Sequence, residues 1–193
     1  EMIDPPSVDV TAHIVELLGR LGYKKGFRPV DRALRYLKRE QEPDGAWYGR
    51  WGVNLTYGIG YVLPALAAVG EDMRAPYVRR AVEWLISHQN ADGGWGERIE
   101  GYYDPAWRGR GPSTASQTAW AILALIAAGE IDRPATVRGI SYLIETQKED
   151  GGWDEPYFTG AGFPTDFMIN YHFYRDVFPV MALGRYRRGR EEG

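Results

Sequence analysis

Four aromatic residues near the C-terminus are spaced as if along one stripe of a helix. Phe163, Phe167, Tyr171 and Tyr174 stand at positions i, i+4, i+8 and i+11. The face of an aromatic ring attracts a cation, by about 2 kcal/mol or more when the cation is desolvated, and the ring is a poor nucleophile. A cavity lined by such rings can therefore hold a carbocation without being alkylated. The same spacing is also typical of a helix face packed in the core. From the spacing alone, the core interpretation is the favoured one.

A carboxylate and an imidazole lie four residues apart near the N-terminus. Asp9 and His13 fall on one face of an expected helix. A protonated His13, oriented by Asp9, would stabilise the anion of a nearby carboxylic acid and so strengthen that acid. A surface pair has the same spacing, and the residues alone favour that interpretation.

A motif that occurs three times supplies the framework for these residues. It reads Gln-x-x-x-Gly-x-Trp after an aromatic–Leu pair, and the copies run over 41–47, 89–95 and 147–153. The glycine accepts a positive φ and so ends a helix. We expect the amide of Gln41, Gln89 and Gln147 to tie N–H groups of the next helix to a neighbouring carbonyl, with Trp47, Trp95 and Trp153 covering it. The motif is interpreted as a structural clasp.

The apolar periodicity predicts seven helices and no strands. They span about 7–20, 29–41, 56–69, 76–89, 114–128, 134–147 and a last helix opened by Pro179. Pro64 predicts a kink in the third. In the first, one apolar face carries Val10, Ile14, Leu17, Leu18 and Leu21.

Polar and apolar helices alternate along the chain. Those that end in the clasp carry Arg and Lys on one side, whereas those that follow are apolar nearly all round. This alternation predicts an all-α fold, an α/α barrel with an outer and an inner ring. Three helical hairpins make about half of such a barrel, and residues 97–111 are expected to form a loop.

The composition excludes several classes of protein. The 193 residues, 44% hydrophobic and 25% charged, suit one globular domain, and a net charge of −3 gives no reason to expect nucleic acid as a partner. The lack of Cys excludes disulfides and thiolate zinc sites, and no metal site is predicted. The longest apolar runs, 61–70 and 119–129, are about half the ~20 residues that a transmembrane helix needs, and no signal peptide is recognised.

The repeat resembles the QW motif of the squalene–hopene and oxidosqualene cyclases. The stretch 154–164, which ends in Gly-Ala-Gly-Phe-Pro, is similar to the bacterial squalene–hopene branch more than to the sterol-forming one. The resemblance extends from Asp9 to Tyr186. It implies a terpenoid cyclase-like toroid and a class II terpene cyclase that needs no cofactor. Such an enzyme protonates a terminal double bond of squalene, closes rings through successive carbocations, and ends by deprotonation or water capture to give a hopene- or hopanol-type pentacycle.

The same resemblance implies roles for individual residues. Asp9 and His13 match residues that support the catalytic acid, and Tyr57 matches a cavity position near that acid. The other residues that match the cavity wall are Trp51, Phe163, Phe167, Ile169, Tyr171 and Tyr174, with Ile169 shaping the far end.

The acid itself is not found in this sequence. The family's signature, Asp-x-Asp-Asp, does not occur in the 193 residues. We therefore expect 1–193 to be the C-terminal part of a longer α/α-barrel cyclase whose N-terminal part is missing, and the chain alone to be inactive. The resemblance further implies peripheral (monotopic) attachment to the cytoplasmic side of the cell membrane, and it allows a homodimer.

Other functions fit the same fold. A protein prenyltransferase β subunit is rejected because its zinc site needs Cys. A carbohydrate-active α/α barrel would need two opposed carboxylates, and nothing places Asp104 and Asp166 in opposition. A non-catalytic helical-repeat module that binds a partner or lipid, and a sterol-type oxidosqualene cyclase, stay open as alternatives.

Overall fold

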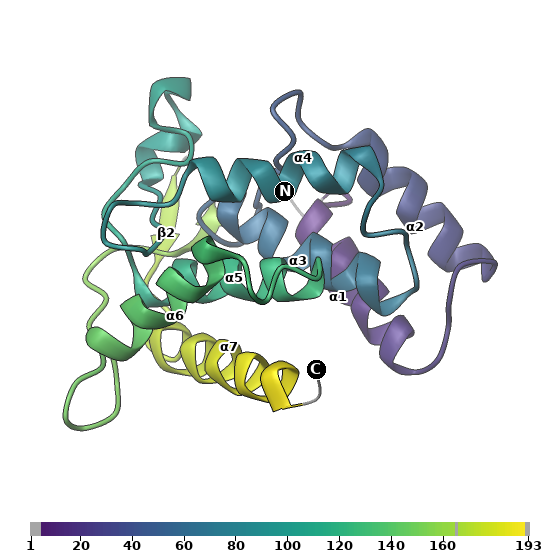
Figure 1. The fold of residues 1–193 in the computed structure, drawn as a ribbon. Coiled ribbons are helices and arrows are strands. Elements are labelled where there is room, and N and C mark those ends of the chain that lie inside the picture. The colour runs from purple at the N-terminus through teal and green to yellow at the C-terminus, as the bar shows by residue number, and fades with distance from the viewer. Residues whose placement is uncertain (1–4, 165, 192–193) are drawn as a thin grey trace.

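The computed structural model describes residues 5–164 and 166–191. Within these ranges the chain forms helices and one small hairpin (Figure 1). The elements are α1 (Val8–Arg20), α2 (Arg28–Arg39), α3 (Leu55–Ala68), α4 (Pro76–Ser87), the short 3-10 helices η1 (Ile99–Tyr102) and η2 (Pro105–Trp107), α5 (Ala115–Ala127), α6 (Pro134–Glu145), the strands β1 (Gly160–Phe163) and β2 (Phe167–Ile169), and α7 (Tyr174–Glu191).

The helices are arranged as two layers of an α/α toroid. The inner layer is α1, α3, α5 and α7, each packed along the next (Figure 1). Helices α3 and α5 are buried along most of their length, whereas α2 buries only Val30, Leu34 and Leu37. The predicted alternation of half-exposed and buried helices is confirmed from α2 to α6, whereas α7 buries only Pro179 and Ala182. The fold is a partial toroid.

The outer helices begin and end as their residues predict. Helices α2, α4 and α6 each have a proline in the first turn, where its missing N–H costs no helical hydrogen bond. Each is followed by a clasp whose glycine has a positive φ: 99° at Gly45, 89° at Gly93 and 88° at Gly151. Because a side chain is strained in that conformation, glycine fixes the turn.

The clasp glutamines bind carbonyl groups as expected, but the N–H groups that Gln41 and Gln89 accept from the next helix belong to the side chains of Arg80 and Arg138 rather than to the main chain. Gln41 Nε2 donates to Gly45 O at 2.8 Å and, across to α4, to Tyr77 O at 2.7 Å. Gln89 Nε2 does the same with Gly93 O and with Ala135 O of α6, each at 2.8 Å. The amide is a donor to two carbonyls, so each of these clasps joins one outer helix to the next.

The clasp tryptophans are all buried and fully hydrogen-bonded. Trp47, Trp95 and Trp153 are each at most 1% exposed. Their indole N–H groups donate to the carbonyls of Leu37, Leu85 and Leu143 at 2.7, 2.7 and 2.8 Å, ten residues back in the preceding helix. The Trp therefore holds the C-terminal end of its own outer helix.

Two predictions near the C-terminus are wrong. Strands β1 and β2 pair antiparallel, with Phe163 opposite Phe167, so these two rings do not continue one helical stripe. Helix α7 begins at Tyr174, and Pro179 lies inside it rather than opening it. Residues 97–111 form the expected loop, which contains η1 and η2.

Helix α1 packs through a different face from the apolar one in the sequence. Val10, Ile14, Leu17 and Leu21 are 47–66% exposed, and the buried residues are Val8, Asp9, Ala12, Val15 and Gly19. A Cβ at Gly19 would lie 2.7 Å from Ala68 of α3, so the small residue lets these helices approach closely. No helix in the described ranges is both long and apolar enough to span a membrane.

Candidate functional site

Aromatic rings from three inner helices touch in one continuous cluster. Tyr57 of α3 meets Trp120 of α5 with ring centroids 4.8 Å apart, and Trp120 meets Tyr174 of α7 at 5.9 Å. Tyr171 lies 4.6 Å from Tyr174 and extends the cluster toward the hairpin. The structure thus brings together three of the predicted site residues, Tyr57, Tyr171 and Tyr174, through a ring that the sequence analysis did not select.

Two further rings of this cluster were also missed. Tyr61 lies 4.7 Å from Tyr57, and Phe178 lies 5.4 Å from Trp120 and 5.0 Å from Tyr174. A signal was available, because Tyr57–Tyr61 and Tyr174–Phe178 each have the i, i+4 spacing that places two rings on one helical face.

Burial raises the pKa of three phenols in the cluster. Tyr57 is only 3% exposed. Burial raises its pKa far above 10, and the nearby Tyr61 hydroxyl and Asp9 carboxylate raise it further. Burial likewise raises the pKa of Tyr61 and Tyr174. These side chains therefore present apolar rings and neutral hydroxyls at physiological pH, with no phenolate that a reactive cation would alkylate.

Asp9 and His13 do not form the pair that their spacing predicts. His13 Nδ1 bonds to the main-chain oxygen of Asp9 at 2.8 Å, and its ring lies 3.9 Å from that of Tyr61. The buried Asp9 carboxylate instead accepts from the main-chain N–H groups of Arg50 at 2.9 Å and Trp51 at 2.7 Å. Asp9 therefore fixes the loop that carries Trp51, and His13 joins the aromatic cluster.

The hairpin is attached to this same loop. Ala161 N donates to Trp51 O at 3.0 Å, and Val53 N donates to Thr159 O at 2.9 Å. Glycines in β1 make room for rings: a Cβ at Gly160 would lie 2.6 Å from the Tyr171 ring, and one at Gly162 would lie 2.6 Å from the Phe167 ring. Trp51, Phe163, Phe167 and Tyr171 are thus held by one main-chain unit.

The aromatic rings of the hairpin, and that of Tyr171 just after it, are exposed to solvent. Phe163 is 54% exposed, Phe167 is 56% exposed and Tyr171 is 38% exposed, while Ile169 is half-buried. Trp51, also half-buried, lines an apolar hollow of about 600 Å³ together with Val10, Ile14 and Leu18 of α1. These side chains present a partly exposed aromatic and apolar surface.

Two buried glutamates anchor the helix ends near the site. The Glu97 carboxylate accepts from Leu55 N at 3.2 Å and from Thr56 N at 2.5 Å, at the start of α3. The Glu155 carboxylate accepts from Ser116 N of α5 at 2.8 Å and from Thr159 Oγ1 at 3.0 Å. A carboxylate is favoured at a helix N-terminus, where free N–H groups gather. Each glutamate stands two residues after a clasp Trp, a Trp-x-Glu signal that the sequence analysis missed.

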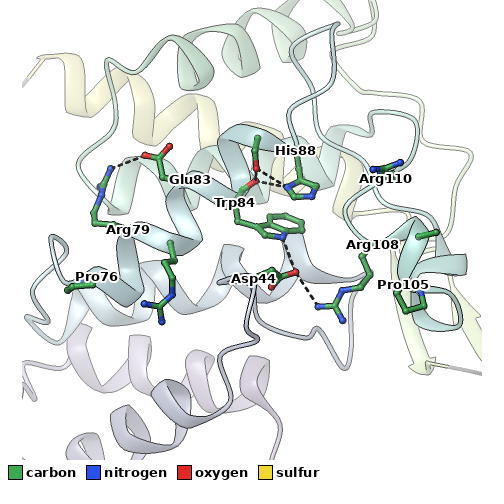
Figure 2. Close-up of a pocket in the computed structure, with 12 residues that line it drawn as sticks. Asp44, Pro76, Arg79, Glu83, Trp84, His88, Pro105, Arg108 and Arg110 are labelled. Carbon is green, nitrogen blue, oxygen red and sulfur yellow. Dashed lines mark hydrogen bonds and ion pairs between the residues drawn. The ribbon is translucent and has the colours of Figure 1, made fainter.

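A larger hollow lies elsewhere, and half of the residues that line it are charged. It measures about 970 Å³ and lies between α4 and the loop 97–111 (Figure 2). Three of its four arginines are engaged: Arg79 pairs with Glu130 at 2.7 Å, Arg80 donates to Gln41 Oε1 at 2.8 Å, and Arg108 pairs with Asp44 at 3.5 Å. His88 stacks on Trp84 at 3.9 Å. It contains none of the predicted site residues, so the aromatic surface is the candidate site.

The fold is similar to that of a solved terpene cyclase. The type II terpene cyclase MstE from Scytonema superposes with a TM-score of 0.63, covering 93% of this chain and 53% of that chain at 18% identity, which shows a shared fold. The model of the squalene-hopene cyclase C-terminal domain matches residues 1–188, and the chain belongs to this family.

Relatives in this family are similar over nearly the whole chain. The squalene–hopene cyclase of Alicyclobacillus acidocaldarius is 58% identical over 99% of this chain, and that of Bradyrhizobium diazoefficiens is 50% identical over 96%. The chain spans only 30% and 28% of the length of these relatives.

Proposed function

We propose that this chain forms part of the active-site wall of a squalene–hopene-type cyclase. The reaction begins with protonation of a terminal double bond of squalene. The π electrons of successive double bonds then close rings, and the positive charge moves to a new carbon each time. Loss of a proton, or capture of water, ends the cascade and gives a hopene- or hopanol-type product without a cofactor.

The observation that carries this proposal is the continuous set of aromatic rings from Tyr57 through Trp120 and Tyr174 to Tyr171. Ring faces attract each developing cation and do not trap it. Trp51, Phe163 and Phe167 extend the surface, and Ile169 contributes apolar shape at its far end. The role of these residues is to bind and fold the polyene and to exclude water.

In the proposal, Asp9, His13 and Tyr57 lie at the end of the site where the catalytic acid acts. In the proposal His13 and Asp9 support the family's Asp-x-Asp-Asp acid, which these 193 residues do not contain. Asp9 does so through the loop that it anchors, and His13 through its ring, which packs on Tyr61. The chain by itself is therefore expected not to convert squalene. Peripheral attachment to the cytoplasmic face of the cell membrane, and a homodimeric state, complete the proposal by likeness to the family.

A hybrid enzyme tests the proposal. The chain replaces the matching 191-residue region of the Alicyclobacillus cyclase, and squalene conversion is measured by gas chromatography. The controls are the isolated chain and a hybrid whose Asp-x-Asp-Asp acid is changed to Asn. We expect pentacyclic product from the hybrid alone. A folded hybrid that binds but does not cyclise squalene would contradict the proposal and favour a non-catalytic binding module.

A further inference from the structure

Arg50 joins two of the proposed wall residues. Its guanidinium carbon lies 4.5 Å from the centroid of the Trp51 ring and 5.6 Å from that of Phe163. Its Nη1 donates to Gly162 O in β1 at 2.8 Å. Its main-chain N–H is itself held by the Asp9 carboxylate at 2.9 Å. The side chain thus spans from an anchored loop to a strand more than a hundred positions further along the sequence.

We infer that Arg50 is a positioning residue that fixes the spacing between Trp51 and Phe163 in the pocket. A guanidinium is planar and has five N–H donors, so it can lie against a ring and still donate in its own plane to a carbonyl. A lysine ammonium carries the same charge but offers no flat surface for stacking. The geometry therefore calls for Arg in particular, rather than for a cation in general.

This placement also decides which ring faces a ligand can reach. One face of Trp51 and one face of Phe163 are turned toward the guanidinium. A polyene can meet only the opposite faces, and the distance between the two rings sets the width available to it. In the described part of the chain, no Lys or Arg lies over Tyr57, Tyr171 or Tyr174. This consequence rests on the proposed function, whereas the clamp itself does not.

Hydrogen exchange on the 193-residue chain tests the clamp directly. The amides of Ala161 and Val53 bond across the two segments, so their exchange rates report the attachment. We expect Arg50→Met and Arg50→Lys each to speed exchange of these two amides about fivefold or more, with α5 unchanged. The matched control is Arg98→Met, because Arg98 also lies over a ring, Trp107, at 5.2 Å but outside the site. Unchanged exchange in both Arg50 variants would overturn the inference.

The product distribution of the hybrid enzyme is a second readout. It would not change if Arg50 had a purely structural role. Both Arg50 variants should raise the share of products released before the last ring closes by about threefold or more, and Arg98→Met should not. If both Arg50 variants gave the same product mixture as the unchanged hybrid, the claim that Arg50 sets the distance between the two rings would be contradicted. If the hybrid is inactive before Arg50 is changed, the proposed function fails, and hydrogen exchange still decides whether Arg50 is a clamp.

Discussion

Aromatic residues serve the clasps and the pocket in opposite ways. At the clasps, Trp47, Trp95 and Trp153 are buried and each indole N–H has a carbonyl partner. On the hairpin, Phe163 and Phe167 are more than half exposed. A clasp ring is packed on all sides by neighbours in the protein, whereas a hairpin ring keeps part of its surface free. Exposure separates the clasp rings from the hairpin rings, but not from Tyr57 and Trp120 of the aromatic cluster, which are 3% and 1% exposed.

The clasp tryptophans should account for much of the stability. Trp95→Ala removes a fully buried ring and a buried hydrogen bond, and we expect the free energy of unfolding to fall by about 3–5 kcal/mol. The control Phe167→Ala removes a mostly exposed ring and should cost less than about 1 kcal/mol. Urea unfolding followed by circular dichroism measures both. Equal losses at the two positions would abolish the distinction between clasp rings and pocket rings.

The glutamines of the three clasps should not be equivalent. Gln89→Ala removes bonds to Gly93 O and to Ala135 O of the next outer helix, and should cost about 1–2 kcal/mol. Gln147 Nε2 donates to Gly151 O at 2.8 Å, and in the described ranges no later outer helix receives a bond from it. Gln147→Ala should therefore cost less than about 1 kcal/mol. If both variants lose the same stability, the bridge between outer helices contributes nothing.

The smallest expected effect is a pH dependence at Glu155. Burial raises its pKa above the ordinary value of 4.5, although hydrogen bonds from Ser116 and Thr159 lower it in part. A carboxyl with a raised pKa in the folded state contributes stability at low pH, and this contribution is lost as the pH rises through that pKa. Glu155→Gln stays neutral, so its stability relative to the parent should increase from about pH 4 to about pH 7. Thermal unfolding of both proteins across this range measures it, and a constant difference would contradict the raised pKa.

The repeat made the architecture predictable. Three copies of one motif fixed where the outer helices end, and the apolar character of 56–69 and 114–128 identified inner helices. The bonding of the clasp Gln was only half predictable, because an amide can donate to carbonyls as readily as it can accept from N–H groups. Which partner it meets depends on how the next helix is placed.

The aromatic residues of the hairpin were expected on one helical stripe because aromatic spacing was weighed above backbone signals. Phe163 and Phe167 have i, i+4 spacing, but Gly160, Gly162 and Pro164 all disfavour a helix there. Those three residues carried the better signal.

Long-range contacts account for what could not be predicted. The Asp9 carboxylate bonds to main-chain groups about forty residues away, and four-residue spacing to His13 gives no hint of this. Likewise, α1 is held through Ala12, Val15 and Gly19 because α3 approaches closely at Gly19, and that approach is a property of the folded structure.

The central claim is that the pocket rings, and not the clasp rings, meet a ligand. Fluorine NMR of the chain labelled with 5-fluorotryptophan tests it, because the seven Trp residues include Trp51 and the three clasp residues. The probe is dodecyltrimethylammonium below its micelle concentration, and the uncharged control is dodecyl alcohol. We predict that both amphiphiles shift the Trp51 resonance, and that Trp47, Trp95 and Trp153 stay unchanged. A Trp51 resonance that does not move, or clasp resonances that move equally, would contradict the account.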